Sequence, residues 1–318
     1  MIEIEMVEIE EEITMMKDLG VIGIVVLWVD MMVNPVVILH LQNIDRKKIM
    51  KTKSIISVIV NGAMGKMGST VISAVDKSDD MKIVGAVDVK SKKNEINLPY
   101  SGDVIEIKSS FTDLLDEIKP NVVVDFTNGN VANEIFIESI RRGISVVSGS
   151  TGLSDKNLTE ISSLATKSKI GCLHASNFAI GAVLLMHLAS IASPYFDYID
   201  LVESHHEMKI DAPSGTAISI AKAIAKYKGK KFESNDTLEE TLKGTRGGIY
   251  EGVNIHSARI PGRVARHEVV FGGPGQTLTI LHDSINRESF MPGVLMGIRK
   301  VIIADRLIVG LDDLLDLK

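Results

Sequence analysis

The most restrictive feature of this chain is a regular alternation of short apolar runs and amphipathic segments that begins at Ser54. The apolar runs are rich in β-branched residues and occupy positions 55–60, 82–87, 121–126, 144–147 and 170–173. Segments with helical periodicity occupy positions 67–75, 131–142 and 155–167. Apolar strands that alternate with helices build a parallel sheet covered on both faces. The pattern therefore predicts an α/β domain around such a sheet.

The rhythm changes after about Ala179. We expect a helix at 181–192, a strand at 198–202 followed by a loop, and a second helix at 216–226. Three strand-like runs follow at 253–260, 267–271 and 276–282, and a last helix at about 291–305. Turns with Gly or Pro, and no helix, separate the three runs, so we expect them to pair antiparallel. This half is predicted to be an α+β domain around an open sheet.

Composition limits the classes of protein that the chain can belong to. Its 318 residues suffice for one large or two medium domains, and 45% apolar and 24% charged residues are ordinary for a globular protein. The net charge of -6, without a long basic run, argues against a nucleic-acid partner. The single cysteine, Cys172, excludes an intramolecular disulfide, fits a reducing cytoplasm and lies in an apolar run typical of a buried structural thiol.

Residues 1 to about 50 do not share the pattern of the rest. An acidic stretch precedes an apolar run at 21–29, which Asp30 separates from a second apolar patch at 35–41. A spanning helix needs about 20 apolar residues, and an acidic flank is wrong for a secretory signal. Three interpretations remain open: a leader from a misplaced start codon with the true start at Met50, an extension without catalytic role, or a membrane anchor. N-terminal sequencing of the native protein would exclude the first if the mature chain began at Met1.

A glycine-rich loop follows the first predicted strand. Gly62, Gly65 and Gly68 form a G-x-x-G-x-x-G pattern that opens a helix, where G-x-G-x-x-G is commoner. Such a loop lets the backbone approach a pyrophosphate and points the free N–H groups of the helix start at it. Asp88 lies 20 residues after Gly68, at the end of the next strand, where a carboxylate can accept hydrogen bonds from the adenine ribose. These features predict a dinucleotide site of the Rossmann type.

The choice of dinucleotide stays open at this point. Asp88 would repel the 2′-phosphate of NADPH, whereas Lys66 or Lys90 could pair with it. Two further loops follow predicted strands on the edge of the sheet where ligands bind, at 149–152 and 175–178. The first offers small residues and hydroxyls to a nicotinamide or ribose, and the second offers an amide and an aromatic ring.

One short segment of the second half gathers proton-transfer groups. His205 and His206 are adjacent, and Lys209 follows His205 by four residues. A histidine exchanges protons near neutral pH, and a lysine supplies positive charge or a proton. The next helix start, with the hydroxyls of Ser214 and Thr216, forms a site for a carboxylate, although either hydroxyl alone is also typical of an N-cap. The combination fits a small anionic substrate that is reduced by hydride and then protonated.

These motifs resemble those of the 4-hydroxy-tetrahydrodipicolinate reductase (dihydrodipicolinate reductase) family. The resemblance runs from about Ser54 to the C-terminus, and its most specific part is the H-H-x-x-K-x-D-x-P-S-G-T-A string at 205–217. Further matching stretches are V-N-G-A-M-G-K-M-G at 60–68, D-F-T at 125–127, S-G-S-T-G at 148–152, S-N-F-A-I-G at 176–181, H-S-A-R at 256–259, H-E-V-V-F-G-G at 267–273 and R-E-S-F at 287–290.

The resemblance implies roles for individual residues. His205 matches the family's proton donor/acceptor, and Lys209 matches its second catalytic proton donor. The positions that hold the substrate carboxylates are matched by His206, Gly215 and Thr216, with Ser214 beside them. The positions that hold NADH and/or NADPH are matched by Gly62, Ala63, Met64, Gly65, Lys66, Met67, Asp88, Gly149, Ser150, Thr151, Ala175, Ser176, Asn177 and Phe178. No metal is expected.

The family's reaction moves hydride from C4 of the nicotinamide to a cyclic unsaturated imine and gives tetrahydrodipicolinate, in lysine and diaminopimelate biosynthesis. Its fold pairs a Rossmann-type parallel sheet with an α+β domain whose open mixed sheet builds a homotetramer. We therefore expect residues 51–178 plus 285–318 to form the dinucleotide-binding domain and residues 179–284 the substrate-binding and tetramerisation domain. The expected substrate is a small cyclic dicarboxylate, and the expected location is the cytoplasm, without a membrane.

The chain departs from the family pattern in a few places. Ser150 stands where the family often has Thr, Asp88 is followed by Val89 rather than the Arg of some members, and the first 49 residues have no counterpart. Two other functions remain open. One is reduction of another small dicarboxylate on the same fold. The other is a non-enzymatic dinucleotide sensor. The intact His205, His206 and Lys209 argue against it, as does the lack of a DNA-binding segment.

Overall fold

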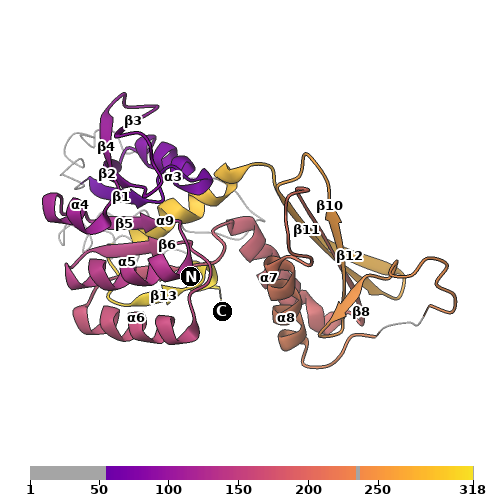
Figure 1. Ribbon diagram of the computed structural model, residues 1–318. Coiled ribbons are helices and arrows are strands. Elements are labelled where there is room, and N and C mark those ends of the chain that lie inside the picture. The colour runs from indigo at the N-terminus through magenta and orange to yellow at the C-terminus, as the bar shows by residue number, and fades with distance from the viewer. Residues whose placement is uncertain (1–54, 234–236, 318) are drawn as a thin grey trace, which may run out of the picture. The chain divides into compact units, whose positions relative to one another are not determined.

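The computed structural model describes residues 55–233 and 237–317 (Figure 1). The three interpretations of residues 1 to about 50 therefore concern a segment outside the described residues. Within the two described ranges, no helix is both long enough and apolar enough to cross a membrane.

The first sheet has eight strands in the order β13-β7-β6-β5-β1-β2-β4-β3. These strands are β1 (Ile56–Asn61), β2 (Met81–Val87), β3 (Glu95–Asn97), β4 (Val104–Lys108), β5 (Val122–Asp125), β6 (Ser145–Ser148), β7 (Cys172–His174) and β13 (Leu307–Val309). All neighbours run parallel except β3 and β4. The predicted parallel sheet is confirmed.

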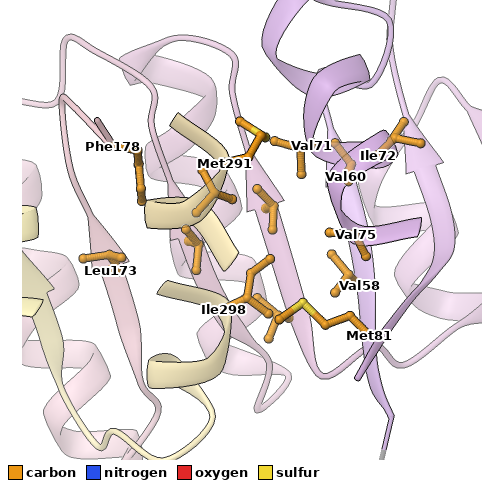
Figure 2. Packing of buried hydrophobic residues seen from close by; sticks show 14 of the residues in the cluster. Val58, Val60, Val71, Ile72, Val75, Met81, Leu173, Phe178, Met291 and Ile298 are labelled. Carbon is orange, nitrogen blue, oxygen red and sulfur yellow. The ribbon is translucent and has the colours of Figure 1, made fainter. Parts of the chain in front are cut away.

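Helices cover both faces of this sheet. They are α3 (Lys66–Asp76), α4 (Phe111–Glu117), α5 (Gly129–Arg141), α6 (Asp155–Ser168), α9 (Met291–Val301) and α10 (Leu311–Leu314). Val58 and Val60 lie in a core shared with α3 and α9, whereas Ile59 lies in a second core shared with α4, α5 and α6. Successive strand residues point to opposite faces, so a strand covered on both sides is apolar throughout. Figure 2 shows the first core, where side chains of β1, α3 and α9 meet.

The second sheet has five strands in the order β12-β11-β8-β10-β9. Its strands are β8 (Tyr198–His205), β9 (Gly248–Tyr250), β10 (Val253–Arg259), β11 (Ala265–Gly273) and β12 (Gln276–Ser284). Its helices and the two short 3-10 helices are α7 (Ile180–Ala192), η1 (Ser193–Tyr195), α8 (Gly215–Lys228) and η2 (Arg287–Phe290). A third core joins α7 and α8 to one face of the sheet, at Leu201, Val269 and Phe271. The predicted fold class, a Rossmann-type sheet plus an α+β part with an open mixed sheet, is confirmed.

The pairing expected for the three late strands is wrong in one respect. β11 and β12 are antiparallel neighbours, but β8 lies between β10 and β11 and runs parallel to β10. Parallel neighbours need a long crossover connection, and the segment from β8 to β10, which contains α8, provides one. The buried Ile199 and Leu201 suit β8 to this central position.

Two element ends differ from the prediction by more than two residues. β8 was expected to end at Val202, but it continues to His205 because residues 203–205 pair with β10 on one side and with β11 on the other. The last helix was expected to reach about residue 305, but α9 ends at Val301, and β13 follows as the edge strand beside β7. The expectation for Cys172 is confirmed, since its thiol is buried and burial raises its pKa to about 12.

Candidate active site

The glycine loop between β1 and α3 is shaped by close backbone approaches. Gly62 has a φ of +76°, and a Cβ at this position would lie 2.8 Å from the carbonyl oxygen of Phe126. A Cβ on Gly68 would lie 2.1 Å from the carbonyl oxygen of Gly62. α3 starts with Gly65 as its N-cap, which offers no side chain to its first N–H groups. These N–H groups remain available to an anion, as a pyrophosphate site requires.

Asp88 ties the end of β2 to this loop. One carboxylate oxygen accepts a hydrogen bond from the backbone N–H of Met64 at 2.9 Å, and the other accepts one from the N–H of Lys90 at 2.9 Å. The N–H groups of Gly62 and Ala63 donate to the carbonyl of Val87 just before it. A half-buried carboxylate therefore lies beside the glycine loop, as expected for a ribose site. Met64 and Lys66 are exposed and Met67 is half-buried.

A cavity of about 480 Å³ adjoins the ends of β1 and β2. Its lining includes residues of both strands, of the segment after β4, and of α4 and α5, among them Asn61, Val87, Val89, Ser109, Phe111 and Val131. Mostly apolar walls with a few polar groups are typical of a ligand pocket. Two of the lining residues, Val87 and Val89, are the chain neighbours of Asp88.

A buried carboxylate organises the middle of the same edge. Asp125 is fully buried and accepts hydrogen bonds from four side chains, at 2.6 to 3.0 Å: Asn61, Thr127, Ser148 and Ser150. The Ser150 hydroxyl also accepts a bond from the N–H of Thr127 at 2.6 Å. The side chain of Ser150 thus holds the loop in place, and the cofactor contact predicted for this residue would have to come from its backbone.

The two loops at 149–152 and 175–178, called the two outer loops below, contain both buried and exposed residues. Thr151 and Ser176 are exposed, and Gly149 packs so tightly on the ring of Phe126 that a Cβ there would lie 2.1 Å from it. Ala175 and Phe178 are buried. Asn177 uses its side-chain oxygen to accept from the N–H of Ala179 at 2.9 Å. Ala175 and Phe178 thus support the loop, and Thr151 and Ser176 have exposed side chains.

The end of β8 carries a second network, around Glu203. This carboxylate is fully buried and accepts a hydrogen bond from His205 Nδ1 and two from Arg259, at 3.1 and 2.9 Å. Burial alone raises the pKa of Glu203, but hydrogen bonds from His205, Arg259 and Ser257 outweigh it and lower the pKa to about 2. Glu203 is therefore ionised at neutral pH.

Ser214 connects this network to α8. Its hydroxyl is the N-cap of the helix and accepts from the N–H of Ala217 at 3.1 Å, while its own N–H donates to Glu203 at 3.3 Å. The hydroxyl also lies 3.2 Å from Nε2 of His267. Since Ser214 is only 1% exposed, its hydroxyl serves the helix start, which is the capping role that its position alone also suggested.

His267 is buried beside the predicted acid–base residue. It is the register partner of Glu203 on β11, and its ring meets the ring of His205 edge-on at 5.3 Å. Burial, together with repulsion from His205, lowers the pKa of His267 to about 4. The folded protein therefore keeps this imidazole neutral near pH 6.

We expect the protein to lose stability in mild acid because of His267. Its folded pKa of about 4 lies below the ordinary value of 6.5, so the unfolded chain binds a proton that the folded chain does not. The free energy of unfolding should fall as the pH drops from about 6.5 to about 4, by on the order of 3 kcal/mol from this group. Urea unfolding of the wild type and His267→Gln at pH 7 and pH 5 measures it. Equal pH dependence in both proteins would contradict the assignment.

The other predicted substrate residues are more accessible. His206 and Thr216 are half-buried, and Gly215 is exposed at the first position of α8. The ammonium group of Lys209 donates to Asp211 at 2.7 Å, and this bond lowers the pKa of Asp211. A cation and a helix start are therefore both open to an anionic ligand.

The hydrogen bonds divide the candidate-site residues into two groups. Hydrogen bonds join the cofactor candidates around the first sheet, and others join Glu203, His205 and Ser214 at the second sheet. Among the hydrogen bonds of the described ranges, none joins a member of one group to a member of the other. The sequence assigned no role to Glu203, Arg259 or His267, although Glu203 begins the E-S-H-H stretch of the family resemblance and the other two lie in its H-S-A-R and H-E-V-V-F-G-G stretches.

The glycine loop after the first strand of a parallel sheet, together with a separate cluster of acid–base side chains, is typical of an oxidoreductase that uses a nicotinamide dinucleotide.

Within the described part of the chain no cluster of three or more His, Cys, Asp or Glu side chains could hold a metal ion.

Comparison with known proteins narrows this class. The family model described as dihydrodipicolinate reductase, N-terminus, matches residues 56–178, and the one for the C-terminus of dihydrodipicolinate reductase matches residues 181–315. The 4-hydroxy-tetrahydrodipicolinate reductase of Gloeothece citriformis is 42% identical over 84% of this chain and 100% of its own length. That of Listeria monocytogenes is 40% identical over 81% and 99%.

A solved structure agrees with these relatives. Dipicolinate-bound dihydrodipicolinate reductase from Paenisporosarcina sp. TG-14 superposes with a TM-score of 0.74 at 37% identity, over 82% of this chain and 99% of that chain. The chain therefore belongs to the dihydrodipicolinate reductase family, whose members are NAD(P)H-dependent oxidoreductases.

Proposed function

We propose that the protein is a 4-hydroxy-tetrahydrodipicolinate reductase of lysine and diaminopimelate biosynthesis. The observation that carries the proposal is agreement over nearly the whole length of relatives with this name, together with an intact acid–base and anion-binding string from His205 to Thr216. A relative whose structure contains dipicolinate supports a cyclic dicarboxylate as the substrate class. When bound, NADH or NADPH supplies hydride from C4 of its nicotinamide to the cyclic imine.

The chain's own residues supply binding and protons in this proposal. His205 gives or takes a proton at Nε2, and Lys209 supplies a second proton and positive charge to the anionic substrate. His206, Gly215 and Thr216 hold the carboxylates at the start of α8, where backbone N–H groups favour anions. The hydroxyl of Ser214, also predicted to bind substrate, is engaged by Ala217 and His267, so we assign it to the support of this helix start.

The proposed cofactor site lies on the first sheet. The pyrophosphate lies against the glycine loop, whose residues are Gly62, Ala63, Met64, Gly65, Lys66 and Met67. Asp88 binds the adenine ribose, and the nicotinamide end lies along the two outer loops, whose residues are Gly149, Ser150, Thr151, Ala175, Ser176, Asn177 and Phe178. The tight approach of Gly68 to Gly62 supports this placement, because it leaves the backbone bare where a phosphate must come close.

A coupled assay tests the function. Dihydrodipicolinate synthase supplies its product, and oxidation of NADH and of NADPH is followed with the purified full-length chain. Oxidation that depends on both the synthase and this protein is the expected result. Failure to oxidise either dinucleotide would reject the proposed function.

Asp88 is expected to favour NADH over NADPH. Replacing Asp88 with alanine removes the ribose acceptor and its repulsion of a 2′-phosphate, so kcat/KM for NADH should fall by roughly tenfold while that for NADPH changes less or rises. Steady-state rates with both dinucleotides measure the ratio. Because Asp88 also holds the N–H of Met64, a general loss for both cofactors would instead indicate a purely structural role.

We also propose a cytoplasmic homotetramer with the two domains expected from the sequence, residues 51–178 plus 285–318 and residues 179–284. The face of the second sheet opposite α7 and α8 carries the half-buried Val202 and Val270 and the exposed Leu281, which supports assembly through this face. Light scattering coupled to size exclusion should give four times the mass of one chain. A monomeric mass would reject the assembly.

A further inference from the structure

Glu203 is a buried carboxylate to which the proposed reaction assigns no role. Its hydrogen-bond partners come from three elements: His205 from its own strand, Arg259 and Ser257 from β10, and the N–H of Ser214 from the start of α8. Arg259 contacts both oxygens, and its NH2 group also donates to the carbonyl of Asp211 at 2.6 Å. The carboxylate is thus held on a rigid frame rather than on a loop.

The protonation of Glu203 determines which nitrogen of His205 carries hydrogen. An ionised carboxylate accepts hydrogen bonds and cannot donate them. Nδ1 of His205 must therefore be the donor, and Nε2 is the ring atom left to exchange a proton. The neighbouring His267 meets the ring of His205 edge-on and has Ser214 as the partner of its own Nε2.

We propose that Glu203 is the positioning residue of the reductase: held by Arg259 and the backbone of Ser214, it fixes His205 in the tautomer and orientation that present Nε2 to the substrate. This step rests on the proposed function for the identity of the substrate. The tautomer itself exists without substrate and can be measured alone.

Glutamine at position 203 should reverse the tautomer. Oxygen Oε1 accepts from Arg259 and from the N–H of Ser214, whereas Oε2 accepts from Arg259 and His205. An amide NH2 in place of Oε1 would face two obligatory donors. In place of Oε2 it faces only one, because His205 can become the acceptor at Nδ1. The amide therefore turns its NH2 to His205, and the ring hydrogen moves to Nε2.

The test combines nitrogen NMR of histidine-labelled full-length protein with kinetics. His205 is expected to carry hydrogen on Nδ1 in the wild type and on Nε2 in Glu203→Gln, with the signal assigned through its loss in His205→Asn. We expect kcat to fall at least about tenfold, and at most by the roughly 10²- to 10⁴-fold that acid–base catalysis supplies, while KM and the Kd for NADH stay within about twofold.

Asp80→Asn is the matched control, because it removes the charge from another carboxylate that binds an arginine, Arg299, through two hydrogen bonds of 2.8 and 2.9 Å. It should keep the wild-type kcat and the wild-type His205 signal. A wild-type His205 with hydrogen on Nε2 would overturn the proposal without any variant, as would an unchanged tautomer or kcat in Glu203→Gln. A wild type without reductase activity but with the expected tautomers would reject the proposed function and leave the positioning of His205 standing.

Discussion

Replacement of His205 by alanine is expected to lower kcat by roughly 10²- to 10⁴-fold, the contribution of a well-placed acid–base group. The side chain is 9% exposed and fixed through Nδ1 by Glu203, so its place at the end of β8 is defined before any substrate arrives. Hydride addition to the substrate must be completed by a proton, and the alanine variant has no group at this position to supply or remove one.

The affinity for the dinucleotide is expected to stay near the wild-type value in His205→Ala. None of the cofactor candidates on the first sheet takes its hydrogen bonds from His205. Calorimetry of NADH binding, run beside steady-state rates, separates the two effects. His187→Ala, which removes a half-buried imidazole on α7, is the control and should leave kcat unchanged. Normal turnover by His205→Ala would refute the assignment of this residue.

The strands of the first sheet could be predicted because each is buried on both faces. β1, β2, β5, β6 and β7 are built around short apolar runs, and their predicted bounds differ from the observed ones by at most two residues. β3, β4 and β13 were not predicted because they lack this burial. They lie at or near the sheet edges, have three to five residues and are partly exposed, so they need no continuous apolar run.

The second sheet shows why strand order is harder to predict than strand position. The positions of β10, β11 and β12 follow from their local pattern, but the insertion of β8 between β10 and β11 depends on long-range pairing. The same insertion hid the true end of β8. Glu203 interrupts the apolar pattern, and Arg259, 56 residues away, donates two of the hydrogen bonds that make a charge acceptable at this fully buried position.

The site shows the same division between local and long-range information. His205, Lys209 and the start of α8 lie within one short string, so sequence could point to them. The bond from Ser214 to His267 spans 53 residues and that from Ser150 to Asp125 spans 25, and neither leaves a spacing that identifies it. The hydroxyls of Ser214 and Ser150, which the sequence suggested as ligand-binding groups, therefore form hydrogen bonds within the fold. The residues that hold His205 were not predicted from the sequence.

Lys209→Ala is expected to have the second of the two largest effects, a fall in kcat/KM of at least about 100-fold. Lys209 is partly exposed and lies in the loop between β8 and α8, where its ammonium group is paired with Asp211 at 2.7 Å. A dicarboxylate substrate would compete for this cation, and hydrogen bonds between charged partners are worth about 1.5 to 3 kcal/mol. Loss of a proton donor adds to the loss of that contact, so both KM and kcat should worsen.

Lys209→Arg and Asp211→Asn separate the two contributions. Arginine keeps the charge but does not give up its proton, so it should restore much of KM and little of kcat. Asp211→Asn removes the competing carboxylate and should leave kcat near the wild-type value, because the ammonium group remains. Steady-state rates at saturating NADH, with circular dichroism as a check on folding, measure all three variants. Full recovery of kcat by arginine would show that Lys209 acts through charge alone, and wild-type kcat/KM in Lys209→Ala would remove the residue from the site.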